Sequence, residues 1–292
     1  MRQIDLNAFK SKKPKMLSTK YSKTKVFLTE ILDKREVKKN HYDRTGVKKN
    51  LSVLYSNCCA YCEKKVEKSA HIDHYRPKDT KMYYWLGAEW TNFILVCSDC
   101  NLYKSNNFEI EAKNKASKLD YKNVIDLLEK FNNNWEDLTK SMEIDSQNLK
   151  DEKPLLPHPA FDNAMSFLKF AHNGKIEPYG LSQSRELEQG EYFINTLKFD
   201  VRHSLFESRN QGITDIMNTV TALGSIRNDN DLLIQIDFLL GRILKRYIEK
   251  HEFSFMYLYC FINFKTLFID TQEEPFKSRL LNLYMKIIHK VL

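Results

Sequence analysis

The 292-residue chain has no uninterrupted apolar run of the roughly 18 residues that a membrane-spanning helix needs. Its first residues, MRQIDLNAFKSKKPK, also lack the apolar core of a secretory signal, which predicts a cytoplasmic protein. No internal repeat is evident, and neither is a separate base-reading domain such as a helix-turn-helix or a zinc-finger array. These absences argue against a membrane protein, and they weaken the case for a restriction enzyme that carries its own reading domain.

The composition favours a folded protein with a reduced interior. Hydrophobic residues make up 42% of the chain, enough for one large core or two smaller ones, so we expect one or two domains. Because the cytoplasm keeps thiols reduced, the six cysteines are more easily explained as metal ligands or core residues than as disulfides.

The positive charge is concentrated at the N-terminus. Residues 1–50 carry fifteen Lys and Arg against five Asp and Glu, whereas the whole chain has a net charge of +8. Such a segment can neutralise nucleic-acid phosphates, or it can be a solvated tail, and charge alone does not separate the two. Since residues 1–20 lack apolar periodicity, we expect them to form a basic flexible arm.

Hydrophobic spacing predicts an α+β protein that is mostly helical. Helical periodicity occurs at residues 24–39, 47–57, 122–134, 184–209, 229–253 and 273–292. Four of the seven prolines lie within 154–178, which predicts loops and short strands there. We expect a metal-bearing module with leading helices over residues 21–150 and a helical C-terminal region over 151–292.

Two CxxC pairs predict a structural zinc site. Cys59 and Cys62 are separated by 34 residues from Cys97 and Cys100, and two such knuckles can present four thiolates to one tetrahedral ion. A redox CxxC would not explain the second pair. Cys58 stands beside the first knuckle and could compete as a ligand.

The sequence between the knuckles, HIDHYRP, contains the adjacent pair Asp73 and His74. On a short strand, neighbouring side chains point to opposite sides, so one can hold a hard cation while the other faces a substrate. Phosphodiester hydrolysis needs this division, because a divalent ion stabilises the leaving oxygen and a neutral imidazole takes a proton from water.

Four segments, CAYC, IDHYRPK, EWTNFILVC and CNLYK, together resemble HNH endonucleases, which have the ββα-metal fold. The resemblance implies that His74 is the general base and that Asp73 and Asn101 bind the catalytic Mg²⁺ or Mn²⁺. It also implies that Asn92 braces the loop carrying His74, and that the four cysteines hold a structural zinc. Asn101 stands where the family name has its last His, a variation that the family contains.

Two basic residues near this motif are candidates for substrate binding. Arg76 could clamp a phosphate with two parallel hydrogen bonds, or it could form a structural salt bridge. Lys104, one helical turn after Asn101, would face the phosphate. The aromatic residues 83–85 and Trp90 could stack on bases, but in a small zinc module such residues are more often core.

The resemblance narrows over residues 50–210 to the HNH subunit of the Septu antiphage system, including its retron-associated relatives. This family implies an ATPase partner of the ABC/SMC-like type (PtuA-like), a DNA or RNA substrate and, in the retron relatives, a reverse transcriptase with its noncoding RNA. We expect the partner to bind the C-terminal region. The family often has Glu in place of Asp73 and Asn in place of His158, so we assign His158 no role.

Two alternatives remain open at this stage. The chain could cleave RNA such as tRNA in a retron-linked abortive-infection system. It could also be a zinc-ribbon module that binds nucleic acid without catalysis, although this leaves Asp73, His74 and Asn101 unexplained.

Overall fold

The computed structural model describes residues 1–14, 17, 29–31, 34, 36–38, 44–79, 83–111 and 140–291. The helix expected over 122–134 lies outside the described residues, as does most of the one expected over 24–39. The α-helices are α1 (Leu6–Ser11), α3 (Arg44–Leu54), α4 (Ser98–Lys104), α7 (Gln147–Lys150), α8 (Arg185–Leu197), α9 (His203–Ala222), α10 (Asp229–Ile248), α11 (Ser254–Ile262) and α12 (Phe276–Val291). The strands are β1 (His71–His74), β2 (Phe93–Val96), β3 (Leu168–Phe170) and β4 (Ile176–Pro178). The predicted α+β, mostly helical class is confirmed.

The strands β1 and β2 and the helix α4 form a ββα unit. The strands are antiparallel, with Asp73 opposite Ile94 and His74 opposite Phe93. All four residues of β2, FILV, are buried, as expected for an apolar strand covered on both faces. The helix α4 begins at once after β2, because the Cys97 sulfur accepts a hydrogen bond from the backbone N–H of Cys100 and caps the first turn. α3 packs against both strands.

The segment expected to be helical over 184–209 is divided in two. Ser184 caps the start of α8 by accepting a hydrogen bond from the backbone N–H of Leu187. The helix ends at Leu197, because the next residue, Lys198, has a left-handed φ of 54°, and α9 then begins at His203. A left-handed residue is a usual helix stop, but here it is a lysine instead of the more common glycine.

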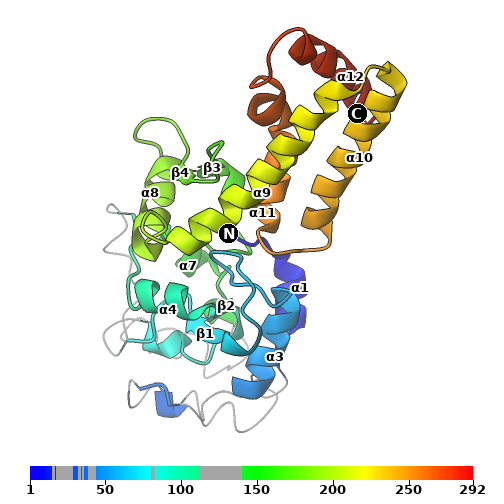
Figure 1. The fold of residues 1–292 in the computed structure, drawn as a ribbon. Coiled ribbons are helices and arrows are strands. Elements are labelled where there is room, and N and C mark those ends of the chain that lie inside the picture. The colour runs from blue at the N-terminus through cyan, green and yellow to red at the C-terminus, as the bar shows by residue number, and fades with distance from the viewer. Residues whose placement is uncertain are drawn as a thin grey trace.

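The C-terminal helices extend away from the body that the two strand pairs form (Figure 1). α10 packs against α11 and α12, and its buried residues continue one hydrophobic cluster that also includes the ββα unit. Within the described residues, no helix has the length and apolarity required to cross a bilayer.

The expected boundary after residue 150 does not separate two packing units. Glu152 pairs with Arg76, and the Tyr75 hydroxyl donates to the Leu156 carbonyl. The segment 140–162 therefore completes the metal-bearing module, although the charge-rich sequence around 150 gave no sign of it.

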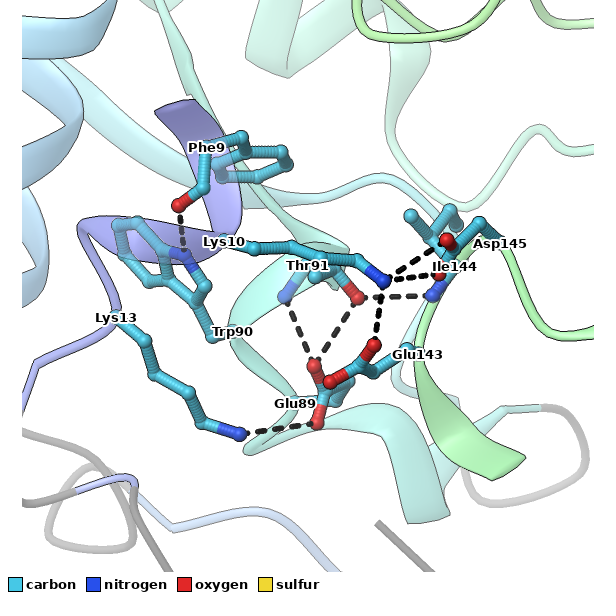
Figure 2. Close-up of polar contacts among 9 residues, drawn as sticks. All are labelled: Phe9, Lys10, Lys13, Glu89, Trp90, Thr91, Glu143, Ile144 and Asp145. Carbon is cyan, nitrogen blue, oxygen red and sulfur yellow. Dashed lines mark hydrogen bonds and ion pairs between the residues drawn. The ribbon is translucent and has the colours of Figure 1, made fainter. Parts of the chain in front are cut away.

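The expectation of a flexible arm over residues 1–20 is wrong for residues 1–14. Phe9 on α1 is fully buried, its ring lies 5.3 Å from that of Trp90, and its carbonyl accepts a hydrogen bond from Trp90 Nε1 at 2.7 Å. Lys10 pairs with Glu143 at 2.6 Å and with Asp145 at 2.8 Å (Figure 2). The basic residues of this segment thus partly serve to dock it.

Replacing Phe9 with Ala should lower the free energy of unfolding by about 3 to 5 kcal/mol, because the change leaves a cavity beside Trp90. Urea denaturation followed by tryptophan fluorescence measures the effect. Lys12→Ala, at an exposed position of the same segment, is the matched control and should change little. Equal stability of both variants and the parent would mean that α1 does not dock in solution.

Candidate active site and metal centre

The four predicted zinc ligands come together in space. The sulfur atoms of Cys59, Cys62, Cys97 and Cys100 all lie within 4.8 Å of one another, and all four residues are buried. Cys62 Sγ lies 3.7 Å from Cys97 Sγ. In a tetrahedral site with Zn–S bonds of about 2.3 Å, the sulfur atoms are about 3.8 Å apart, so this separation fits a zinc ion.

Two arginines from the C-terminal region face this sulfur cluster. Arg202 Nη1 lies 3.1 Å from Cys100 Sγ, and its Nη2 lies 3.8 Å from Cys97 Sγ and 3.3 Å from a carboxylate oxygen of Asp99. Burial lowers the pKa of Arg202, but attraction to the cysteines outweighs it and the net shift is upward. Arg209 also lies near Cys62, and burial lowers its pKa to about 10.

These arginines have a clear electrostatic purpose. Four thiolates around one Zn²⁺ leave a net charge of −2, which a buried site must offset. Sequence reasoning missed both residues, because they lie about one hundred positions after the second knuckle and no local spacing connects them to it.

The structure places Asp73 and His74 at the end of β1, both largely buried. The ammonium of Lys104 on α4 lies 3.2 Å from Asp73 Oδ2 and donates to the backbone carbonyl of His74 at 2.9 Å. Burial raises the pKa of the Asp73 carboxyl, and the charge of Lys104 opposes that rise. The ββα unit thus brings the Asp73 carboxylate and the Lys104 ammonium together beside the main chain of His74.

The His74 ring is fixed in one orientation. Its Nε2 lies 3.0 Å from the Gly87 carbonyl oxygen, and the Phe93 ring contacts it edge to face with centroids 5.0 Å apart. Because a carbonyl only accepts, Nε2 carries the proton and the lone pair is on Nδ1. Burial, aided by Lys78 and Lys104, lowers the pKa of His74 to about 3, so the imidazole is neutral at physiological pH.

Asn92 holds the chain just beyond His74. Its side-chain oxygen accepts from the Arg76 backbone N–H at 2.8 Å, and its amide nitrogen donates to the Arg76 carbonyl at 3.0 Å and to the Leu86 carbonyl at 3.3 Å. This is the position where the family resemblance puts a bracing residue. Both arms of the loop between β1 and β2 are tied to this one side chain.

The residues expected to bind the catalytic ion have suitable donor atoms. Asp73 is largely buried, and its Oδ2 lies 3.2 Å from the Lys104 ammonium. Asn101 lies one turn before Lys104, on the face of α4 that turns toward β1, and is half-buried. A carboxylate and an amide oxygen are donors that Mg²⁺ and Mn²⁺ accept.

The two residues expected to bind the scissile phosphate, Arg76 and Lys104, are both buried and paired with other residues of the chain. Arg76 is buried, with Nε 2.9 Å from Glu152 Oε2 and Nη2 donating to the Leu149 carbonyl at 2.8 Å. The salt-bridge alternative is therefore the one the structure shows. Lys104 is fully buried, and its ammonium is used by Asp73, His74 and the Ser105 carbonyl. The sequence could not reveal these partners, because Glu152 lies 76 positions after Arg76.

The remaining candidate residues, the aromatic side chains and the two other cysteines, are part of the core. The aromatic residues 83–85 and Trp90 are buried in the core. Cys58 is buried outside the four-sulfur cluster, and Cys260 is a buried thiol in α11.

Comparison with known proteins agrees with this geometry. Residues 59–107 match the family model of HNH endonucleases. The chain is also similar to the Septu protein PtuB of Bacillus mycoides (strain KBAB4), with 24% identity over an alignment of 234 residues that covers 74% of this chain and 69% of the relative. No solved structure matches the chain.

Replacing Arg202 with Met should weaken zinc binding by about tenfold or more, because the thiolates lose the cation that offsets their charge. Competition with a chromogenic chelator measures the affinity for zinc. Arg227→Met, at an exposed position, is the control and should leave the affinity unchanged. Equal zinc affinity in both variants would contradict this role, and a preparation without zinc would overturn the four-cysteine assignment.

Proposed function

We propose that the chain, which matches the HNH endonuclease family over residues 59–107 and is similar to a Septu PtuB protein, is a metal-dependent endonuclease of bacterial antiphage defence. The observation that carries the proposal is the state of His74: a neutral imidazole, held by Gly87, on the residue that directly follows the buried carboxylate of Asp73. An acid–base residue beside a cation ligand is what phosphodiester hydrolysis needs.

His74 is the general base in this proposal. Its Nδ1 accepts a proton from the attacking water, while the hydrogen bond from Nε2 to the Gly87 carbonyl stabilises the imidazolium that forms. Asn92 limits the movement of the loop and so keeps the ring in register with the phosphate. A base of low pKa is weak but is fully unprotonated at neutral pH.

Asp73 and Asn101 would hold one Mg²⁺ or Mn²⁺. The ion supplies positive charge at the scissile phosphate and at the departing 3′ oxygen when it is bound. The low exposure of Asp73 excludes bulk water and strengthens the attraction between its carboxylate and a cation.

The substrate is a nucleic acid, either DNA or an RNA such as tRNA. HNH chemistry acts on the phosphodiester, which both polymers share, so the site residues do not distinguish them. A link to a retron reverse transcriptase and its noncoding RNA remains part of the proposal through the family resemblance alone.

The proposed partner is an ATPase subunit of the ABC/SMC-like type, bound to the C-terminal helices. On α10, Ile234 and Phe238 are each 62% exposed and lie one turn apart, next to the basic residues Arg242 and Lys245. An apolar pair with a basic rim is typical of a protein interface.

Replacing His74 with Ala should lower cleavage by about two to four orders of magnitude, because the proton acceptor is lost. Purified chain, alone and with any copurifying ATPase, is assayed on plasmid DNA and on total tRNA with Mg²⁺ or Mn²⁺. Retained zinc content and circular dichroism show that the variant is folded. Unchanged cleavage by the folded variant would remove His74 from the mechanism, and the substrate that is cut identifies the substrate class.

Phe238→Asp should abolish copurification with the ATPase subunit and leave zinc binding intact, since a charge at the centre of the exposed apolar pair is costly to bury. Leu181→Asp is the matched control, because Leu181 is 83% exposed on a loop outside α10. Affinity pull-down of the tagged variants measures the association. An intact complex with Phe238→Asp would place the partner elsewhere.

A further inference from the structure

A cavity of about 160 Å³ lies on the side of the module where residues 144–162 cover the loop after β1. Its lining includes Arg76, Lys150, Lys153, His158, Phe161 and Arg185. The proposed nuclease chemistry uses none of them. The cavity is far larger than one water molecule needs, and a cavity of about 150 Å³ holds a molecule the size of benzene.

Two guanidinium nitrogens of the lining residues have no hydrogen-bond acceptor among the described residues. They are Nη1 of Arg76 and Nε of Arg185, and both atoms are buried. The Arg76 side chain as a whole is only 1% exposed. An unsatisfied guanidinium N–H in the interior costs free energy, so these atoms indicate a site for an acceptor that the protein itself does not supply.

The ring of His158 also lines the cavity. Its Nδ1 accepts from the Ala160 backbone N–H at 3.1 Å, so Nε2 carries the proton and the main chain of Thr91 is its neighbour. The two guanidinium donors come from segments far apart in the sequence and share one lining.

The charges around the cavity favour an anion. Four of its described lining residues are cationic, and only Asp162 is acidic. The Asp162 oxygens are already directed to the chain's own donors, because one accepts from the His158 backbone N–H at 2.7 Å and the other lies 3.5 Å from Gln189 Nε2. Behind the lining, Glu152 balances the charge of Arg76, and Lys153 lies 4.0 Å from Glu111. Arg185 and Lys150 have no acid partner among the described residues.

We propose that this cavity binds a phosphate monoester, with the phosphate between Arg76 and Arg185. Guanidinium groups match phosphate oxygens in geometry as well as charge, and a phosphate offers acceptors to both guanidinium donors. The cavity is too small to enclose a whole nucleotide, so the ester group extends to the mouth, where Phe161 is 38% exposed and can stack on a base.

The test is isothermal titration calorimetry on the zinc-loaded full chain without other divalent ions, using 5′-AMP, inorganic phosphate and adenosine as probes. We expect 5′-AMP and phosphate to bind and adenosine alone not to bind. Tighter binding of 5′-AMP than of phosphate identifies a mononucleotide, and equal affinity identifies the phosphate group as the whole determinant. Absence of saturable binding of both anions overturns the proposal, because the cavity then holds only water.

Variants locate the binding. Arg185→Met and Lys150→Met should each weaken 5′-AMP binding, the first by about tenfold or more, because a charge-assisted hydrogen bond is lost. Lys175→Met, exposed before β4, is the control and should bind as the parent does. His74→Ala should also bind 5′-AMP normally. Weaker binding in His74→Ala with no change in Arg185→Met or Lys150→Met would put the phosphate at the nuclease site and overturn the proposal, whether or not the nuclease assignment holds.

Discussion

The four-sulfur cluster is the constraint on which the arrangement of β1, β2 and α4 depends. The strands β1 and β2 have four residues each, too few for a stable unit of their own. An ion held by the four cysteines would tie the end of β2 to the Cys59–Cys62 turn and so supply folding free energy. Cys97 is both a cluster member and the cap of α4. The cluster thereby sets where α4 begins, and with it the position of Asn101 and Lys104 along the helix relative to β1.

The same cluster joins the module to the C-terminal region. Arg202 contacts two of its sulfur atoms, and Glu63, directly after Cys62, accepts hydrogen bonds from the Ser254 hydroxyl and the Phe255 backbone N–H. Two buried polar connections therefore run from the knuckles to the C-terminal region, one from the second knuckle to the start of α9 and one from the first knuckle to the start of α11. A partner that moves those helices would act on a rigid connection, because buried polar contacts are costly to break.

The local part of the site could be predicted from sequence, and the distant part could not. Cysteine spacing and the Asp73–His74 pair lie within one short stretch, so the chemistry of the ligands indicates their geometry. The partner of Arg76 lies 76 residues further on, and a buried ion pair leaves no periodic trace in a sequence. Phe9 was missed for another reason: it is the buried residue of a helix of only six residues, and the hydrophobic pattern that marks a docked helix needs several such residues.

Arg76 connects the candidate active site with the phosphate cavity. It lies two residues after His74, and the Asn92 side chain bonds both its backbone N–H and its carbonyl. Its side chain lines the cavity and is held by the Glu152 carboxylate and the Leu149 carbonyl. Replacing Arg76 would leave Glu152 charged, buried and without its cation, at a cost of about 3 to 5 kcal/mol. Loss of activity in such a variant could not be assigned to the active site or to the cavity, because the destabilised fold would affect both. Arg185 donates to the Pro154 carbonyl at 3.1 Å, but neither Arg185 nor Lys150 is paired with an acid among the described residues, so their replacement separates binding from stability better than replacement of Arg76 does.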